Sequence, residues 1–187
     1  MSVFTNPAGT SAEHASAYIA AVLDLLGDRD PLEVLRSTAA ALENVLDELS
    51  HDQVTRRERP GKWSVRHVLQ HLADSELVWG YRLRMILAHD RPQLSGYDQD
   101  LWAERLGYDR ADARQALHDF AALRNSNLRL LANASADDLK RVALHAERGE
   151  ESVAHLIRLY AGHDLLHLRQ IDRIRRAVDA PDGGRDD

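Results

Sequence analysis

Apolar residues recur at intervals of three and four along most of the chain, which is the spacing of a helix with one buried face. No long stretch alternates apolar and polar residues in the manner of a strand. The pattern predicts a short leading helix and four helices of about twenty or more residues, at roughly 11–26, 31–50, 65–88, 110–132 and 152–178. We therefore expect an all-α fold, a four-helix bundle preceded by a short N-terminal helix.

Capping residues mark several of these boundaries. Asp30-Pro31 places a cap residue and a proline at the start of the second helix, and Glu33 follows at its third position. Ser64 is placed to cap the third helix, and Gly27 to end the first.

Two long connections interrupt the helical pattern. Residues 89–109 contain Pro92 and two glycines, and residues 133–151 contain an extended piece at 142–144. Connections of this length are uncommon within a compact domain and tend to be functional. They indicate a bundle that is not a simple up-down-up-down arrangement.

The chain is expected to divide into three parts. A helical leader spans 1–30, the bundle domain spans 31–178, and a polar segment at 179–187 is expected to be a disordered tail. The length of 187 residues suits one such domain.

Composition narrows the classes of function. The chain has no cysteine, which excludes disulfides, thiolate zinc sites and a cysteine nucleophile. A net charge of −6 disfavours binding to nucleic acid. No signal segment or membrane-spanning apolar run is evident, so we expect a cytoplasmic protein without a membrane partner.

The candidate chemistry lies in three of the 10 histidines. His163 and His167 are four residues apart in the last predicted helix, and they therefore share one face. Two buried imidazoles need partners, which a shared metal ion or carboxylates would provide. Asp164 stands where the zincin motif requires glutamate, and this argues against a protease.

His71 lies among apolar residues of the third predicted helix and would supply a third nitrogen from a facing helix. Three histidines with an open position are typical of a catalytic metal site. His67 is either a fourth ligand or an exposed residue, and Asp74 either orients a ligand imidazole or is solvated. A di-iron carboxylate bundle is rejected, because its Glu-x-x-His spacing occurs only at Glu48 and His51, at a helix end.

Several stretches, in the same order as in the family, resemble the DinB/YfiT-like superfamily. They are Gly61-Lys62-Trp63-Ser64-Val65-Arg66, His71-Leu72-Ala73-Asp74-Ser75-Glu76, Gly96-Tyr97-Asp98-Gln99-Asp100-Leu101-Trp102, and His145 to Val153, which runs on into Leu159 to His163 and His167-Leu168. One departure is Gln70, where some relatives carry a second histidine.

The resemblance implies a four-helix bundle that holds a divalent ion on His71, His163 and His167. Zinc is the first expectation, with nickel or iron as alternatives, and frequent homodimers are also implied. Relatives are described as metal-dependent hydrolases, and some transfer a low-molecular-weight thiol such as mycothiol or bacillithiol to electrophiles.

We therefore expect an enzyme for a small-molecule substrate, a hydrolase or a thiol S-transferase. A divalent ion on three neutral imidazoles would lower the pKa of a water or a thiol. Tyr97 and Trp102 are expected to line the pocket, and Asp98 and His145 are candidate catalytic residues. His145 would act as a proton shuttle, and Glu147 is a second candidate for that role. The alternatives are a binding module without turnover, and a structural bundle whose histidines are satisfied by hydrogen bonds.

Overall fold

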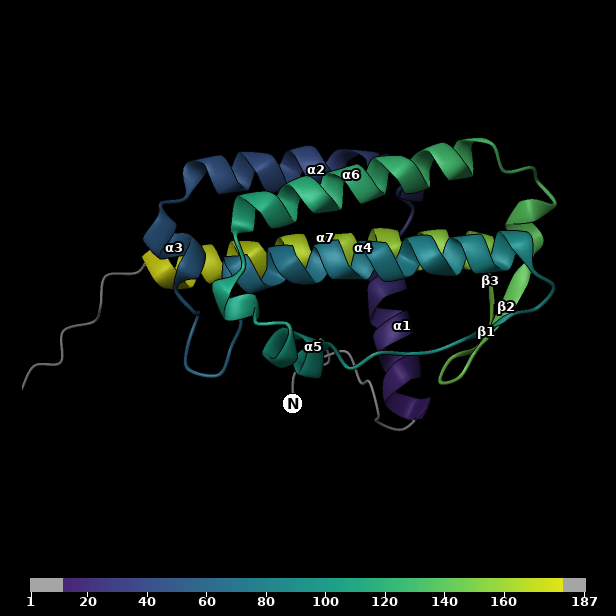
Figure 1. The fold of residues 1–187 in the computed structure, drawn as a ribbon, viewed down its shortest axis with the longest axis horizontal. Helices are drawn as coiled ribbons and strands as arrows, with labels where there is room; N and C mark the ends of the chain where they lie inside the picture. Colours follow the sequence, from purple (N-terminus) through teal and green to yellow (C-terminus); the bar gives the residue numbers. More distant parts are fainter. Residues whose placement is uncertain (1–11, 180–187) are drawn as a thin grey trace, which may run out of the picture.

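The computed structural model of the protein describes residues 12–179, and four long helices lie side by side in it (Figure 1). They are α2 (Pro31–Glu48), α4 (Val65–Ala88), α6 (Ala113–Ala132) and α7 (Val153–Asp179). The predicted four-helix bundle is thus confirmed, with helix boundaries close to those expected. The outer part of the predicted leader, 1–11, and the predicted tail at 180–187 lie outside the described residues.

The helices are connected in an unusual order. Figure 1 shows α4 and α6 running in one direction, and α2 and α7 in the other. α4 packs against α6 and α7, and α2 packs against the same two helices, so α2 and α4 occupy opposite corners. Because α4 and α6 are parallel neighbours, the chain must return along the whole bundle between them. This requirement explains the long connection after α4.

Both long connections contain short elements. The first holds β1 (Gln93–Leu94), α5 (Gln99–Arg105) and the 3₁₀ turn η1 (Tyr108–Arg110). The second holds the 3₁₀ turn η2 (Asp138–Lys140), β2 (Val142–His145) and β3 (Gly149–Ser152). β1 pairs with β2 in parallel and β2 with β3 in an antiparallel hairpin. The sequence predicted only an extended piece here, because strands this short show no alternation.

Local capping explains where the helices start. Asp30 accepts a hydrogen bond from the Leu32 amide at 2.8 Å, as the sequence predicted. After α2 the chain forms the short helix α3 (His51–Thr55), in which Ser50 and Gln53 make a reciprocal capping box. Asp112 caps α6, which therefore begins three residues later than predicted.

The core consists of two apolar clusters with a polar layer between them. One cluster includes Leu35, Leu83, Leu156 and Tyr160, and the other includes Leu42, Leu69, Phe120 and Ile174. Between them, each long helix contributes a buried polar residue: Thr38, Glu76, Arg124 and Asp164. The four helices therefore enclose a layer of buried polar side chains between the two apolar clusters.

Helix α1 (Ala12–Leu26) crosses the bundle and packs on α7 (Figure 1). The two helices approach closely at Gly162, where an added Cβ would overlap the carbonyl oxygen of Val22. Gly162 precedes one of the candidate ligands, so the crossing brings α1 beside the histidines. Within the described part of the chain, no helix combines the length and the apolar character needed to cross a membrane.

Candidate metal centre

Three histidine side chains meet between α4 and α7. His71 comes from α4, and His163 and His167 come from α7. Nε2 of His163 lies 3.3 Å from Nε2 of His71 and 3.1 Å from Nε2 of His167. Ligand atoms of all three lie within 4.8 Å of one another. The structure thus brings together the residues whose spacing suggested a metal site.

The donor set fits a divalent ion. Nitrogen ligands at about 2.0–2.1 Å in tetrahedral geometry lie about 3.3 Å apart, close to the two Nε2 separations. Burial lowers the pKa of His71 and His163 well below the usual range, and lowers the pKa of His167 to about 4. All three imidazoles are therefore neutral at pH 7, the form that binds metal.

Neighbouring side chains fix two of the rings. Nδ1 of His167 donates to Oε1 of Gln170 at 2.7 Å, which leaves its Nε2 lone pair free for an ion. The indole of Trp63 lies against His71, with 5.1 Å between the ring centroids. Nδ1 of His71 is buried and has no hydrogen-bond partner, whereas its Nε2 lies 3.4 Å from the Ser75 hydroxyl.

Asp74, one of the two candidate roles of which was to orient a ligand imidazole, bonds to other groups. Its carboxylate accepts the Tyr108 hydroxyl at 2.5 Å and the Gln70 side-chain amide at 3.3 Å. Burial and this hydrogen bond raise the pKa of Tyr108, so the phenol keeps its proton. Asp74 thus joins α4 to η1 and does not orient an imidazole. The group that orients a ligand is Gln170, on α7.

His67 is neither exposed nor a ligand. Only 3% of it is accessible, and its Nδ1 lies 2.7 Å from the Ser64 hydroxyl. Its Nε2 lies 3.1 Å from a carboxylate oxygen of Asp109 and 3.0 Å from the Arg57 guanidinium. Both ring nitrogens are occupied, so His67 braces the start of α4.

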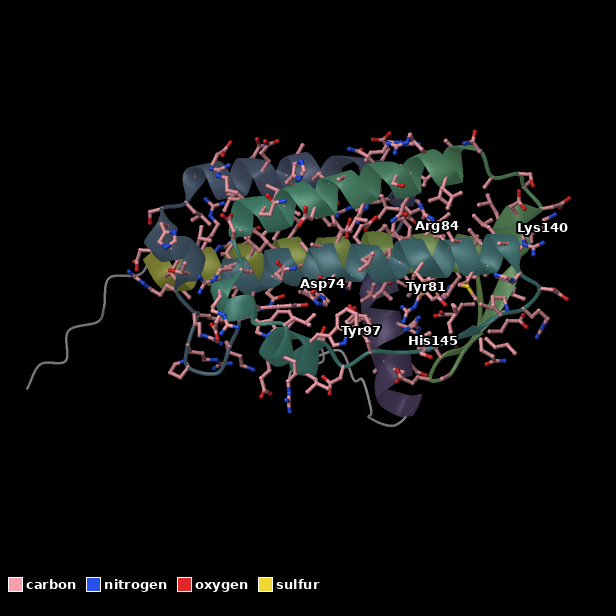
Figure 2. All side chains as sticks on the ribbon, viewed as in Figure 1. Asp74, Tyr81, Arg84, Tyr97, Lys140 and His145 are labelled. Atoms are coloured by element: carbon pink, nitrogen blue, oxygen red, sulfur yellow. The ribbon has the colours of Figure 1, made fainter. Side chains whose placement is uncertain are left out.

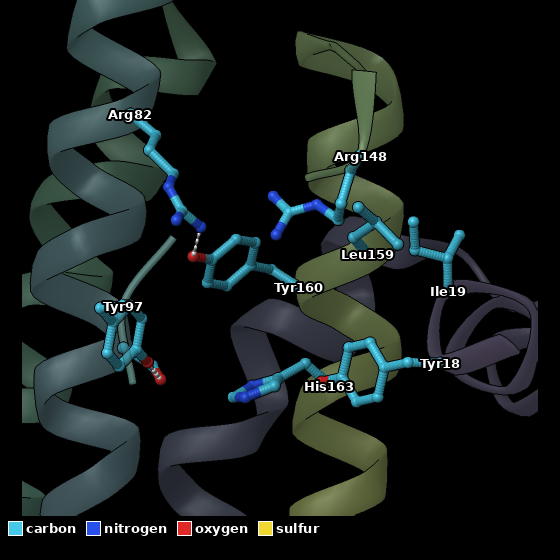
Figure 3. Close-up of a pocket in the computed structure, with 9 residues that line it drawn as sticks. Tyr18, Ile19, Arg82, Tyr97, Arg148, Leu159, Tyr160 and His163 are labelled. Atoms are coloured by element: carbon cyan, nitrogen blue, oxygen red, sulfur yellow. Dashed lines mark hydrogen bonds between the residues drawn. The ribbon is translucent and has the colours of Figure 1, made fainter. Parts of the chain in front are cut away.

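A cavity of about 60 Å³ opens beside His163 (Figure 3). Side chains of α1, α4 and α7 and of the two long connections line it. They are Tyr18, Ile19, Ser75, Arg82, Tyr97, Arg148, Leu159, Tyr160 and His163. A volume of this size holds a few waters or a small chemical group. His163 therefore joins the histidine cluster to a space in which a substrate could bind.

Of the two residues expected to line the pocket, one lines the cavity and the other packs behind it. Tyr97 lines the cavity, and its hydroxyl lies 2.6 Å from the Ser75 hydroxyl. Trp102 is outside the lining and packs on the Tyr97 ring, with 4.4 Å between centroids. Asp98 is exposed, and its carboxylate caps α5 by accepting the amides of Asp100 and Leu101. The geometry gives Asp98 this capping role and supports no catalytic one.

His145 is buried, not on the surface. Its Nε2 lies 3.3 Å from Arg82, and its Nδ1 accepts the Glu147 amide at 3.2 Å. Figure 2 shows His145 and Tyr97 on the same side of α4. Burial, helped by Arg148 and Arg82, lowers the pKa of His145 to about 4. His145 thus contacts the cavity wall through Arg82, and a proton-shuttle role for it stays a prediction, as does that of Glu147.

Behind the histidines lies a buried ionic network. Arg124 of α6 binds Asp164 at 2.6 Å and Glu76 at 2.8 Å, and all three are almost fully buried. Asn127 donates to Glu76 at 2.8 Å. Asp164, which follows His163, thus faces the bundle interior, in agreement with the sequence argument against a protease.

Sequence reasoning missed three residues of this region. Arg82 is three helical turns after His71, so a search for polar residues on the apolar face of α4 would have found it. Gln170 follows His167 by three residues, the spacing of side chains that meet on a helix. Arg148 carries no such signal, because only the pairing of β2 with β3 brings it to the cavity.

Comparisons with known proteins identify the family of the chain. The model of the DinB superfamily matches residues 35–171. A protein of Oceanobacillus iheyensis named as a candidate metal-dependent hydrolase is 32% identical over 74% of this chain and 80% of its own length. One of Halalkalibacterium halodurans with the same description is 30% identical over 76% of this chain and 81% of its own length.

The fold is also that of a solved structure, YfiT from Bacillus subtilis, described as a probable metal-dependent hydrolase with an unusual four-helix bundle topology. The two align with a TM-score of 0.73 at 23% identity, over 94% of this chain and 93% of that one. The match to the family model and the identity to the two relatives lead to one conclusion: the chain belongs to the DinB superfamily.

Proposed function

We propose that the protein is a metal-dependent hydrolase that holds one divalent ion, zinc in the first instance, on His71, His163 and His167. The observation that carries the proposal is the convergence of three neutral imidazole nitrogens, 3.1 and 3.3 Å apart, beside a cavity. The names of the two relatives and of YfiT support it. When bound, the ion supplies Lewis acidity that favours deprotonation of a nucleophile near neutral pH.

The residues of the chain contribute binding and orientation. Gln170 holds the His167 ring so that Nε2 faces the other two histidines. Burial raises the pKa of Tyr97, so its phenol stays protonated and can donate a hydrogen bond to a substrate oxygen. The Ser75 hydroxyl, 2.6 Å away, fixes the direction of that phenol.

The nucleophile is either water or an external thiol. The chain has no cysteine, so any thiol would enter from solution as a low-molecular-weight compound. A thiol would make the protein an S-transferase with the same metal centre.

The test is a screen of activated esters and alkylating electrophiles with the zinc-loaded protein, with and without thiols. We expect turnover that requires zinc and is lost in His163→Ala. The matched control is His118→Ala, since the His118 side chain is 77% accessible and lies on α6. Turnover that is equal in the metal-free protein would contradict the proposal, and zinc uptake without any turnover would favour the non-catalytic binding module. Homodimerisation and cytoplasmic location stay predictions.

A further inference from the structure

The cavity wall contains a buried cation without a counter-charge. Arg82 is only 5% accessible. Its guanidinium donates to the Ser95 carbonyl at 2.6 Å and to the Tyr160 hydroxyl at 3.4 Å, and it lies 3.3 Å from His145. The two acceptors and the imidazole of His145 are neutral, and none of the ion pairs among the described residues includes Arg82. Burial of a charge without a partner of opposite charge is costly, so such a residue is retained where it binds something.

A second guanidinium faces the same space. Figure 3 shows the guanidinium groups of Arg82, on α4, and Arg148, beside α7, on the same side of the Tyr160 ring, with the Tyr160 hydroxyl next to Arg82. Arg148 is engaged with Glu151 through two bonds, of 2.6 and 2.8 Å, and Glu151 is 1% accessible. The only carboxylate paired at this wall, that of Glu151, is thus engaged by Arg148, and Arg82 has no ion-pair partner among the described residues.

The other polar groups of the cavity favour the same class of ligand. Tyr97 and Ser75 present hydroxyls, and Tyr97 stays protonated. Guanidinium forks and hydroxyls together complement the oxygen atoms of an anion. No carboxylate belongs to the cavity lining among the described residues.

We propose that this cavity binds an anionic oxygen group of the substrate, a carboxylate or a phosphate, with Arg82 as the main cation and Arg148 as the second. The assignment of that anion to a substrate rests on the proposed function, whereas the anion site itself does not. With the anion at Arg82, the remainder of the substrate extends toward His163 at the other end of the same cavity.

The experiment measures anion binding by the full-length protein without metal, so that no ion can attract the probe. Sodium butyrate and inorganic phosphate are titrated separately at constant ionic strength and followed by calorimetry. We expect one of them to bind, which identifies the anionic group. Arg82→Gln should weaken that binding roughly ten- to a hundredfold, the range for loss of charged hydrogen bonds. The anion affinity of Arg82→Lys should lie between those of the wild type and of Arg82→Gln.

Arg91→Gln is the matched control, because Arg91 is exposed and already paired with Glu150. It should bind the probe as the wild type does. If Arg82→Gln fails to fold, Arg82→Lys and Arg148→Gln carry the test, and both should weaken binding. The proposal is overturned if neither probe binds the wild type, or if the Arg82 variants bind as tightly as the wild type.

The same samples separate this proposal from the metal proposal. Anion binding that depends on Arg82, in a protein that takes up no zinc, would support the anion site and reject the metal-dependent function. Zinc uptake by the wild type without binding of either anion would reject the anion site alone.

Discussion

Individual hydrogen bonds decide how well the three histidines are prepared for an ion. Gln170 holds His167 through Nδ1, whereas Nδ1 of His71 has no hydrogen-bond partner and Trp63 packs on the His71 ring. The ligand that is oriented by a hydrogen bond loses less freedom when an ion binds. The sequence offered Asp74 for this task, but that carboxylate is already engaged by Tyr108.

Replacement of Gln170 by alanine should therefore weaken zinc binding by roughly tenfold or more, the usual effect of removing a group that orients a ligand. The change should leave the fold intact, because Gln170 is only partly buried. Competition with a chelator of known affinity measures it. The control is Gln115→Ala, an exposed glutamine on α6 that bonds to Asp119. Equal zinc affinity in Gln170→Ala and the wild type would argue against the orienting role.

A second prediction at the residue scale concerns His145 and the pH dependence of stability. Burial lowers its pKa in the folded protein to about 4, from 6.5 in the unfolded chain. Between these two pH values the unfolded chain binds more protons than the folded protein. The contribution of neutral His145 to the free energy of unfolding is therefore complete above pH 6.5 and is lost as the pH falls toward 4. His145→Gln should make the stability of the metal-free protein less dependent on pH in this window.

Melting temperatures at pH 7.0 and 4.5 measure the effect of His145. His118→Gln, at an exposed position, should keep the pH dependence of the wild type. An identical pH dependence in His145→Gln and the wild type would show that His145 is not buried in its neutral form.

Among the elements, α1 is positioned by a single glycine of α7. Gly162 has no side chain where the Val22 carbonyl of α1 crosses, and Tyr18 and Ile19 of α1 thereby reach the cavity. The docking of α1 and the shape of the cavity are thus coupled.

The substitution Gly162→Ala tests this contact, because helix propensity and overlap with Val22 change the stability in opposite directions. Propensity alone would stabilise α7 by about 1 kcal/mol, whereas overlap with Val22 should cost about 1–3 kcal/mol. We expect a net decrease of the melting temperature by a few degrees, measured by calorimetry. An unchanged or higher melting temperature would mean that α1 does not dock closely at this position.

The buried network between helices makes the next prediction. Arg124 is the cation paired with both Glu76 and Asp164, so its removal would leave two buried carboxyl groups without a cation. Arg124→Ala should lower the free energy of unfolding by about 3–5 kcal/mol, the usual cost of breaking a buried pair. Arg114→Ala on the same helix removes an exposed pair with Asp47 and should cost less than about 1 kcal/mol. Chemical denaturation compares the two, and similar losses would contradict the account.

At the scale of the whole molecule, the sequence was informative wherever a long helix repeats its pattern. The four bundle helices and the leading helix followed from apolar spacing, and His71, His163 and His167 followed because helical spacing places them on buried faces. The strands β1 to β3 and the short helix α3 did not, since two to five residues carry too little periodicity. Contacts between distant segments, such as Arg148 at the cavity and Asp74 with Tyr108, depend on tertiary structure that no local pattern encodes.

The central claim is that the three converging histidines hold one metal ion. Elemental analysis of untagged protein, beside His71→Ala, His163→Ala and the control His118→Ala, tests it most directly. We expect about one divalent ion per chain in the wild type and in the control, and none in the other two variants. A wild type that takes up neither zinc nor nickel, or full occupancy in His71→Ala, would contradict the claim.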